Sequence, residues 1–255
     1  MSQKRNIKLL LAFDGTGYAG WQKQKSEETI QGVIEDRLRV MTGEPSCLHG
    51  AGRTDAGVHA LGMVANFETG TDIPGQGFVK GLNSLLPRDI RILDAKVVAA
   101  DFHARRSARA KIYWYNLTNG PVQLPTKRLY WAHLFRELDF AAIEAGLELI
   151  SGTHDFSSFE GSGSRDPEFS GRGAVRTIFE AKINRIGEDN YHRIIITGDG
   201  FLRHMVRNIV GTLLEVGQGK LIPSDVADIL DARDRSAAGP TAPACGLFLK
   251  EVLYG

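Results

Sequence analysis

The sequence predicts an α+β protein of two similar halves, each a mostly antiparallel sheet with helices on one face, and an active-site cleft between them. Three observations predict this architecture. Short apolar runs of strand length alternate with segments of helical periodicity along the chain. The second half repeats the kinds of element found in the first, and 255 residues suffice for two domains of ordinary size. We place the halves at residues 1–105 and 106–255, without support from any literal repeat.

The first half begins with an apolar run at residues 7–13, which is typical of a strand. Ile30, Val33, Ile34 and Leu38 then recur at helical spacing, predicting a helix over residues 28–41 that ends near Gly43. The other expected elements of this half are strands at 63–67 and 90–98 and a short helix at 78–86, stopped by Pro87.

The second half has the same ingredients. We expect strands at 111–117, 177–186, 191–197 and 247–253, the middle two facing each other across a turn around Gly187, and helices at 140–150, 201–216 and 223–230. Residues 159–173 are rich in Gly, Ser and mixed charge, which predicts a mobile surface loop.

The amino-acid composition limits the classes of protein to which the chain can belong. The chain is 42% hydrophobic and 24% charged, as in a soluble globular protein, and no apolar run is long enough to span a bilayer. The polar start MSQKRN lacks the apolar region of a signal peptide, so we expect a cytoplasmic protein with no membrane partner. Cys47 and Cys245 have no metal-binding or disulfide spacing and are expected to be reduced structural thiols.

The net charge of +1 does not by itself predict a binding partner, but the charged residues are unevenly distributed along the chain. Between Asp101 and Arg136 there are seven basic residues against one acid, 7 − 1 = +6, with seven aromatic residues among them. This pattern is typical of a surface that binds a phosphate backbone, and equally of a solvated basic strand and loop. The basic residues are Arg105, Arg106, Arg109, Lys111, Lys127, Arg128 and Arg136.

The stretch GTGYAG, residues 15–20, matches a dinucleotide-binding pattern directly after a strand. The third glycine of that pattern should open a helix, whereas WQKQKSEE intervenes here, so a glycine turn is the better interpretation. A nucleotide-dependent enzyme using this stretch as a phosphate loop is the weakest alternative.

The stretch GAGRTDAGVHA, residues 50–60, sets Asp55 among three glycines. It lacks the ending of a P-loop, and Asp55 with His59 supplies too few ligands for a metal. A lone loop aspartate is usually a turn or cap residue. The alternative is a catalytic acid whose glycines let the backbone approach a ligand.

Two further segments carry candidate residues. In the helix expected at 201–216, Arg203 and Arg207 share a face, and an arginine near a core needs an anion: Asp55, an RNA phosphate or an ordinary ion pair. In KIYWY, strand alternation puts Tyr113 and Tyr115 on one face and Trp114 on the other, so an aromatic ring could pack in the core or stack on a base.

GAGRTDAGVHA, DFHARRSARAKIYWY, FLRHMVRNIVGTLLEVG and TAPACGLFL, in this order, resemble the TruA family of tRNA pseudouridine synthases, and KGLNSLLP at residues 80–87 agrees. The likeness runs from the first strand to the last. It is weakest at residues 159–173, and Cys245 stands where many relatives carry another, often acidic, residue.

The resemblance implies isomerisation of uridines 38, 39 and 40 in the anticodon stem-loop of tRNA, by a homodimer that needs no cofactor and no metal. Asp55 would be the catalytic carboxylate, attacking the sugar C1′ or taking a sugar proton on the way to a glycal. Tyr113 would stack on the target base, and Arg207 would pair with Asp55 and keep it ionised. Arg53 would help hold the everted nucleotide, and Leu247 would line the pocket.

The competing hypothesis is a non-catalytic RNA-binding or chaperone module that uses the same basic, aromatic surface. Such a module would bind RNA in a salt-sensitive manner and leave it chemically unchanged.

Overall fold

The computed structural model describes residues 4–161, 172–187 and 190–255. The chain forms two compact units, one of Met1–Arg109 with Phe248–Gly255 and one of Ala110–Leu247. The predicted boundary follows residue 105, whereas the chain first passes from one unit to the other after Arg109, four residues later. The closing strand was assigned to the second half, whereas it pairs with a strand of the first unit.

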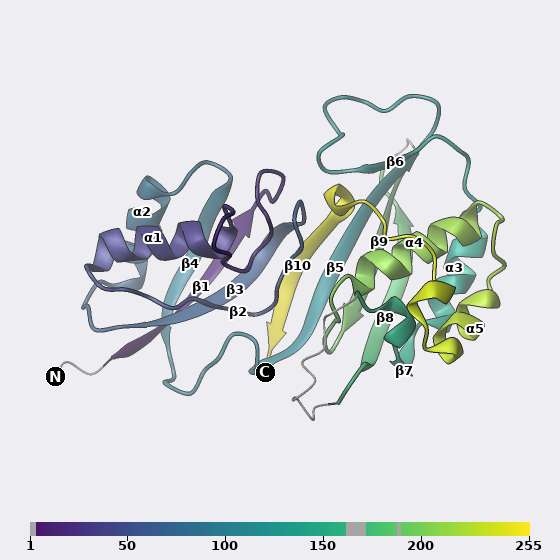
Figure 1. The fold of residues 1–255 in the computed structure, drawn as a ribbon. Coiled ribbons are helices and arrows are strands. Elements are labelled where there is room, and N and C mark those ends of the chain that lie inside the picture. Colours follow the sequence, from purple (N-terminus) through teal and green to yellow (C-terminus); the bar gives the residue numbers. More distant parts are fainter. Residues whose placement is uncertain (1–3, 162–171, 188–189) are drawn as a thin grey trace. The chain divides into compact units, whose positions relative to one another are not determined.

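The first unit is a twisted sheet with two helices on one face (Figure 1). Its strands are β1 (Arg5–Phe13), β2 (His49–Gly50), β3 (His59–Thr69), β4 (Ile90–Val98) and β10 (Leu247–Tyr254), and its helices are α1 (Ile30–Thr42) and α2 (Gly75–Leu85). The order is β4-β1-β3-β10, with β2 also paired to β3. All pairs are antiparallel except β3 with β10, which run parallel from Phe248 opposite His59.

Alternation along β1 builds the core of this unit. Ile7, Leu9 and Leu11 are fully buried, since alternate residues of a strand face the same side. Helix α1 is capped at both ends. Thr29 caps its start by accepting from the Gly32 amide, and Gly43 ends it in the left-handed conformation at φ 75°.

The second unit repeats this design with more helices (Figure 1). Its main strands are β5 (Ala108–Asn119), β9 (Tyr191–Gly198), β8 (Val175–Arg185) and β7 (Gly152–Asp155), adjacent in that order and antiparallel, and the short β6 (Ala132–Leu134) lies parallel beside β5. One face is covered by α3 (Phe140–Leu149), α4 (Met205–Gly217) and α5 (Asp225–Ala232).

The predicted α+β class is therefore confirmed, with a sheet and helices in each unit. The expected helix over residues 201–216 was wrong at its start, because α4 begins only at Met205 and follows His204, whose φ of 60° is left-handed. Arg203 thus precedes the helix and does not share a helical face with Arg207. The loop expected at 159–173 falls mostly on residues 162–171, outside the described part of the chain.

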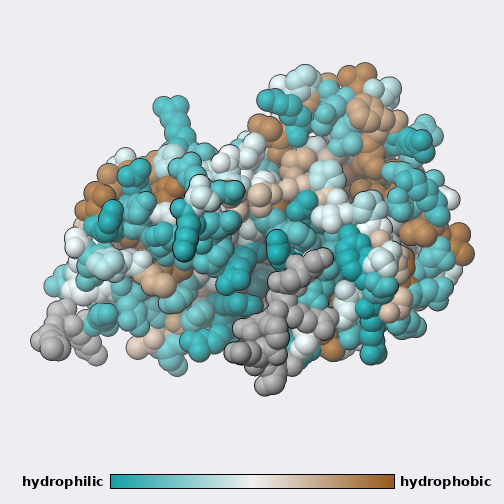
Figure 2. All heavy atoms as spheres, in the orientation of Figure 1, coloured by the Kyte–Doolittle hydropathy of each residue, from teal (hydrophilic) through white to brown (hydrophobic). Residues whose placement is uncertain are grey.

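The surface is mostly hydrophilic on the face drawn in Figure 2. A brown patch stands at the upper right, where Figure 1 draws the loop between β5 and β6. Val122, Leu124 and Phe135, in and just beyond this loop, are all at least half exposed. Within the described residues, no helix has the length and apolar character needed to cross a membrane.

Candidate active site

Asp55 lies in the connection from β2 to β3, which we call the Asp55 loop (residues 51–58). Its backbone carbonyl accepts a hydrogen bond from the Val58 amide at 3.1 Å, so residues 55–58 form a tight turn. Gly57, at the third position, has a φ of 76°, the left-handed value that a type II turn requires there. Asp55 is half-buried and Arg53 is exposed, which leaves the arginine side chain accessible from solvent.

The small residues around Asp55 have a packing reason. A β-carbon added at Gly50 would lie 2.6 Å from the indole of Trp21, a distance that real side chains do not tolerate. The indole, only 2% exposed, therefore lies directly on the glycine backbone. Ala51 is fully buried beside it, so a larger side chain has no room there either.

His59 closes the Asp55 loop at the first residue of β3. Its ring is 1% exposed and stacks on Phe248 of β10, with 4.6 Å between the ring centroids. Its Nδ1 accepts from the Gly15 amide at 3.1 Å and lies equally close to an Asp14 carboxylate oxygen. His59 thus ties the end of β1 to the end of the loop.

The GTGYAG stretch is part of a glycine turn (residues 15–21) that follows β1. Helix α1 starts only at Ile30, nine residues beyond Trp21. The dinucleotide-binding geometry, in which the third glycine opens the helix, is therefore absent from this described segment, and the glycine-turn interpretation is confirmed.

In the second unit, Tyr113 sits in β5 with its ring edge-on to Phe201, at 5.0 Å between centroids. It is 7% exposed and Tyr115 is 1% exposed, on the same strand face. On the opposite face, the Arg193 guanidinium lies 3.9 Å above the Trp114 ring. The predicted alternation of KIYWY is confirmed, and both tyrosines are buried on the face that they share.

Arg207 projects from the first turns of α4 and is half-buried. Its Nε donates to the carbonyl of Ala242 at 2.8 Å, while the Ala242 amide donates to the Arg207 carbonyl at 3.0 Å. The reciprocal pair fixes the arginine against the segment that leads to Leu247. That leucine is 5% exposed at the start of β10.

The charge of Arg207 acts on two further groups of this segment. Burial raises the pKa of the Tyr115 hydroxyl, nearby Cys245 raises it further, and Arg207 opposes the shift. Burial likewise raises the pKa of the Cys245 thiol, with Arg207 again opposing. The Tyr115 hydroxyl donates to the Pro243 carbonyl at 3.0 Å. Arg207 and the neighbourhood of Leu247 therefore share one polar, mostly buried environment in the second unit.

Comparison with known proteins decides the family. The family model described as tRNA pseudouridine synthase matches residues 10–105 and 147–255. The chain belongs to the tRNA pseudouridine synthase family. It is 54% identical to tRNA pseudouridine synthase A 1 of Desulfotalea psychrophila, over 98% of this chain and 100% of that protein. The tRNA pseudouridine synthase A proteins of Acetivibrio thermocellus and Geotalea uraniireducens are 48% and 46% identical, over 98% of this chain and 100% of each.

Membership in the tRNA pseudouridine synthase family confirms the predicted resemblance and the enzyme class, an isomerase. The family-model match includes the Asp55 loop and α4, whereas Tyr113 falls in the unmatched stretch between residues 105 and 147. The roles of the individual side chains stay predictions.

The basic segment has the exposure that a nucleic-acid surface of this family needs. Six of its seven basic residues are exposed, all except the half-buried Lys111. Some aromatic rings of the segment are already occupied by protein contacts. Trp131 packs edge-on against Tyr191, and the Lys127 ammonium lies 5.7 Å from the centre of the Tyr191 ring.

Sequence reasoning missed Trp21 and Gln31, which hold the Asp55 loop in place. Gln31 is not one of the apolar residues that predicted α1, so the sequence assigned it no role. The residue is nevertheless only 7% exposed, and its side-chain oxygen and nitrogen each take part in two hydrogen bonds. A polar residue amid a buried helix stripe was the available signal, because such a group must find partners. Among the described residues, no group of three His, Cys, Asp or Glu side chains is placed to hold a metal.

Proposed function

We propose that this protein converts uridine to pseudouridine at positions 38, 39 and 40 in the anticodon stem-loop of tRNA, with Asp55 as the catalytic carboxylate. The observation that carries the proposal is the position of Asp55 at the head of a tight turn within a family member. A loop whose backbone is fixed in this way offers a preorganised carboxylate.

The reaction is an isomerisation that needs no oxidant or reductant. The bond between the sugar C1′ and the base N1 breaks, the base turns, and C1′ bonds to C5. The proton on C5 leaves and N1 gains a proton, so the atoms balance. A carboxylate suits the first step, because it stabilises positive charge developing at C1′ and can act there as nucleophile or take a sugar proton toward a glycal.

The other site residues have separate proposed tasks. Tyr113 stacks on the target base, and its hydroxyl assists removal of the C5 proton. Its edge-on contact with Phe201 supports this role, since the contact fixes the plane of the ring. Arg53 helps hold the everted nucleotide, in keeping with its exposure. Leu247 lines the base pocket.

The proposed pairing of Arg207 with Asp55 rests on the family resemblance. It is compatible with the hydrogen bond from Arg207 Nε to Ala242, because a guanidinium carries five N–H donors and can bond to more than one acceptor.

We further propose that the protein works as a homodimer on tRNA in the cytoplasm. The exposed apolar side chains around the loop between β5 and β6 support an association surface, because contiguous apolar patches commonly mark interfaces. Light scattering on the purified protein should give twice the chain mass of 27.9 kDa.

The decisive experiment incubates the purified protein with unmodified tRNA transcripts that carry uridine at only one of positions 38, 39 and 40. We expect pseudouridine at each position, mapped by chemical labelling and primer extension, and without any added cofactor. Salt-sensitive binding with unchanged RNA would instead favour the non-catalytic RNA-binding module.

A further inference from the structure

The glycine turn contacts the Asp55 loop through backbone groups. The Trp21 amide donates to the Thr54 carbonyl at 3.0 Å, and the Gly57 amide donates to the Tyr18 carbonyl at 3.4 Å. The two bonds fall on either side of Asp55. The Thr54–Asp55 peptide and the Ala56–Gly57 peptide are therefore held from outside the loop.

Gly20 is the closest point of this contact. A β-carbon there would lie 2.5 Å from the Thr54 carbonyl oxygen, 3.1 Å from the Asp55 carbonyl carbon and 3.2 Å from the Ala56 nitrogen. The atoms in the way are backbone, so a side chain at position 20 can be accommodated only if the peptide of Asp55 moves. The φ of Gly20 is 94°, which adds strain for any other residue.

Helix α1 also fixes the glycine turn. The Ile30 amide donates to the Gly20 carbonyl at 3.1 Å, and the Gln31 amide donates to the Trp21 carbonyl at 3.0 Å. The first amides of a helix have no partners within it, so these bonds satisfy the helix start and the turn together.

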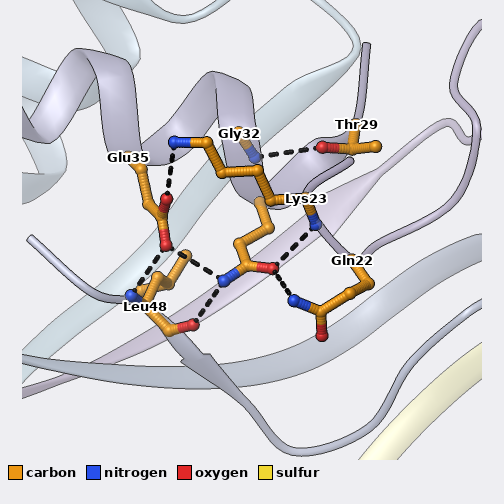
Figure 3. A network of polar contacts seen from close by, with 7 residues as sticks. Gln22, Lys23, Thr29, Gly32, Glu35 and Leu48 are labelled. Carbon is orange, nitrogen blue, oxygen red and sulfur yellow. Dashed lines mark hydrogen bonds and ion pairs between the residues drawn. The ribbon is translucent and has the colours of Figure 1, made fainter. Parts of the chain in front are cut away.

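The side chain of Gln31 extends this support, and Figure 3 labels its partners Gln22, Lys23, Glu35 and Leu48. Its carbonyl oxygen accepts from the Gln22 side chain at 2.8 Å and the Lys23 amide at 2.9 Å. Its amide nitrogen donates to the carbonyl of Leu48 at 3.1 Å and to Glu35 at 3.0 Å. Leu48 directly precedes β2, so one buried side chain joins the end of the glycine turn to the strand that leads into the Asp55 loop.

A second anchor holds the middle of the turn. The buried Tyr18 hydroxyl donates to an Asp89 carboxylate oxygen at 2.8 Å, and the Asp89 carbonyl accepts from the Asp14 amide at 2.9 Å. The Tyr18 carbonyl accepts the hydrogen bond from the Gly57 amide. Tyr18 is therefore bonded both to Asp89 and to the Asp55 loop.

We propose that the glycine turn is the positioning element of the catalytic carboxylate and that Gly20 is its central positioning residue. The proposal rests on the proposed catalytic role of Asp55. A carboxylate that acts at one carbon atom must be held to a fraction of an ångström, and a displacement of about 1 Å costs on the order of 100-fold in rate. The turn supplies this accuracy without contacting the reacting atoms.

The test compares Gly20→Ala with Gly43→Ala. Gly43 has a φ of 75° and no atom within 4 Å of an added β-carbon, so its variant carries a similar backbone strain at the end of α1, outside the glycine turn and the Asp55 loop. For Gly20→Ala we expect kcat per folded molecule to fall roughly 10- to 100-fold, with the Kd for tRNA changed less than about twofold. Gly43→Ala should keep the wild-type kcat.

Tyr18→Phe serves as a milder second variant and decides the matter if Gly20→Ala does not fold. It keeps the buried ring and removes only the bond to Asp89, so kcat should fall by about 3- to 10-fold with tRNA binding unchanged. A folded Gly20→Ala with wild-type kcat, or a parallel loss of tRNA affinity in either variant, would overturn the proposal, as would wild-type kcat in Tyr18→Phe.

Asp55→Asn distinguishes a failure of the positioning role from a failure of the proposed catalytic role of Asp55. Activity in Asp55→Asn would remove the proposed catalytic role itself. An inactive Asp55→Asn beside a fully active, folded Gly20→Ala would contradict only the positioning role of the turn.

Discussion

The indole of Trp21 packs on the backbone of Gly50, so that a β-carbon at position 50 would lie 2.6 Å from the ring. A residue of the glycine turn thereby fills the space that the small residues before Asp55 leave open. The glycines and alanines of this stretch are thus complementary to a large buried side chain from elsewhere in the same unit.

Gly50→Ala should destabilise the protein, because Trp21 or the β2 backbone must shift to admit the methyl group. Overpacking of this kind costs about 1–3 kcal/mol in the free energy of unfolding, measurable by urea denaturation. Gly17→Ala is the matched control, since a β-carbon there meets nothing within 4 Å. Equal stability of the two variants would refute the packing.

Tyr113→Phe should separate stacking from proton transfer. The ring and its contact with Phe201 remain, and only the hydroxyl is lost. If the hydroxyl assists removal of the C5 proton, kcat should fall by roughly 100-fold or more while tRNA affinity is kept. Wild-type kcat would limit Tyr113 to stacking.

Arg207→Lys should retain only part of the activity. The lysine keeps one positive charge but loses the planar fork that bonds to Ala242 and that can bond to a second acceptor at the same time. We expect kcat to fall about 10-fold in Arg207→Lys and further in Arg207→Gln, with kcat measured at saturating tRNA. An active Arg207→Gln would show that the charge is dispensable.

Folding stability should fall as the pH drops below about 6.5, partly because of His192. Burial, aided by the Arg185 charge, lowers the pKa of this histidine below its ordinary 6.5. The unfolded chain then binds a proton that the folded chain does not, so acid favours unfolding. His192→Gln should lose less stability between pH 7.5 and 5.5 than the wild type, by urea titration at both values. An unchanged difference would contradict the lowered pKa of the half-buried His192 ring.

Much of the fold could be predicted from local signals. The apolar spacing of α1 and its end near Gly43 lie in one short segment, and the structure confirms the predicted bounds of 28–41 within two residues. Strand β4 was also predicted at its observed bounds, because the segment is rich in Ile, Leu and Val and follows Pro87.

The start of α4 could not be predicted, because Phe201 and Met205 have helical spacing although they serve different neighbours. Phe201 packs on Tyr113 of a strand, and the left-handed His204 separates it from the helix. Such contacts depend on tertiary structure, which periodicity does not report.

For the candidate site, too, only the local sequence motif could be predicted. The block around Asp55 could be recognised from its letters, whereas the partners that hold it come from residues 15–31 and are joined to it mainly through backbone groups. Gly20 therefore carried no signal of its own, and the glycine turn could be excluded as a nucleotide site without being assigned a task.

The central claim is that the Asp55 carboxylate performs the chemistry, and the most direct measurement is single-turnover pseudouridine formation by Asp55→Asn on an anticodon stem-loop substrate. The amide keeps the size of the side chain and removes its charge. We expect the rate to fall at least about 1,000-fold, while the Kd for tRNA stays within a few-fold of the wild-type value. A rate near wild type in the folded variant would contradict the account.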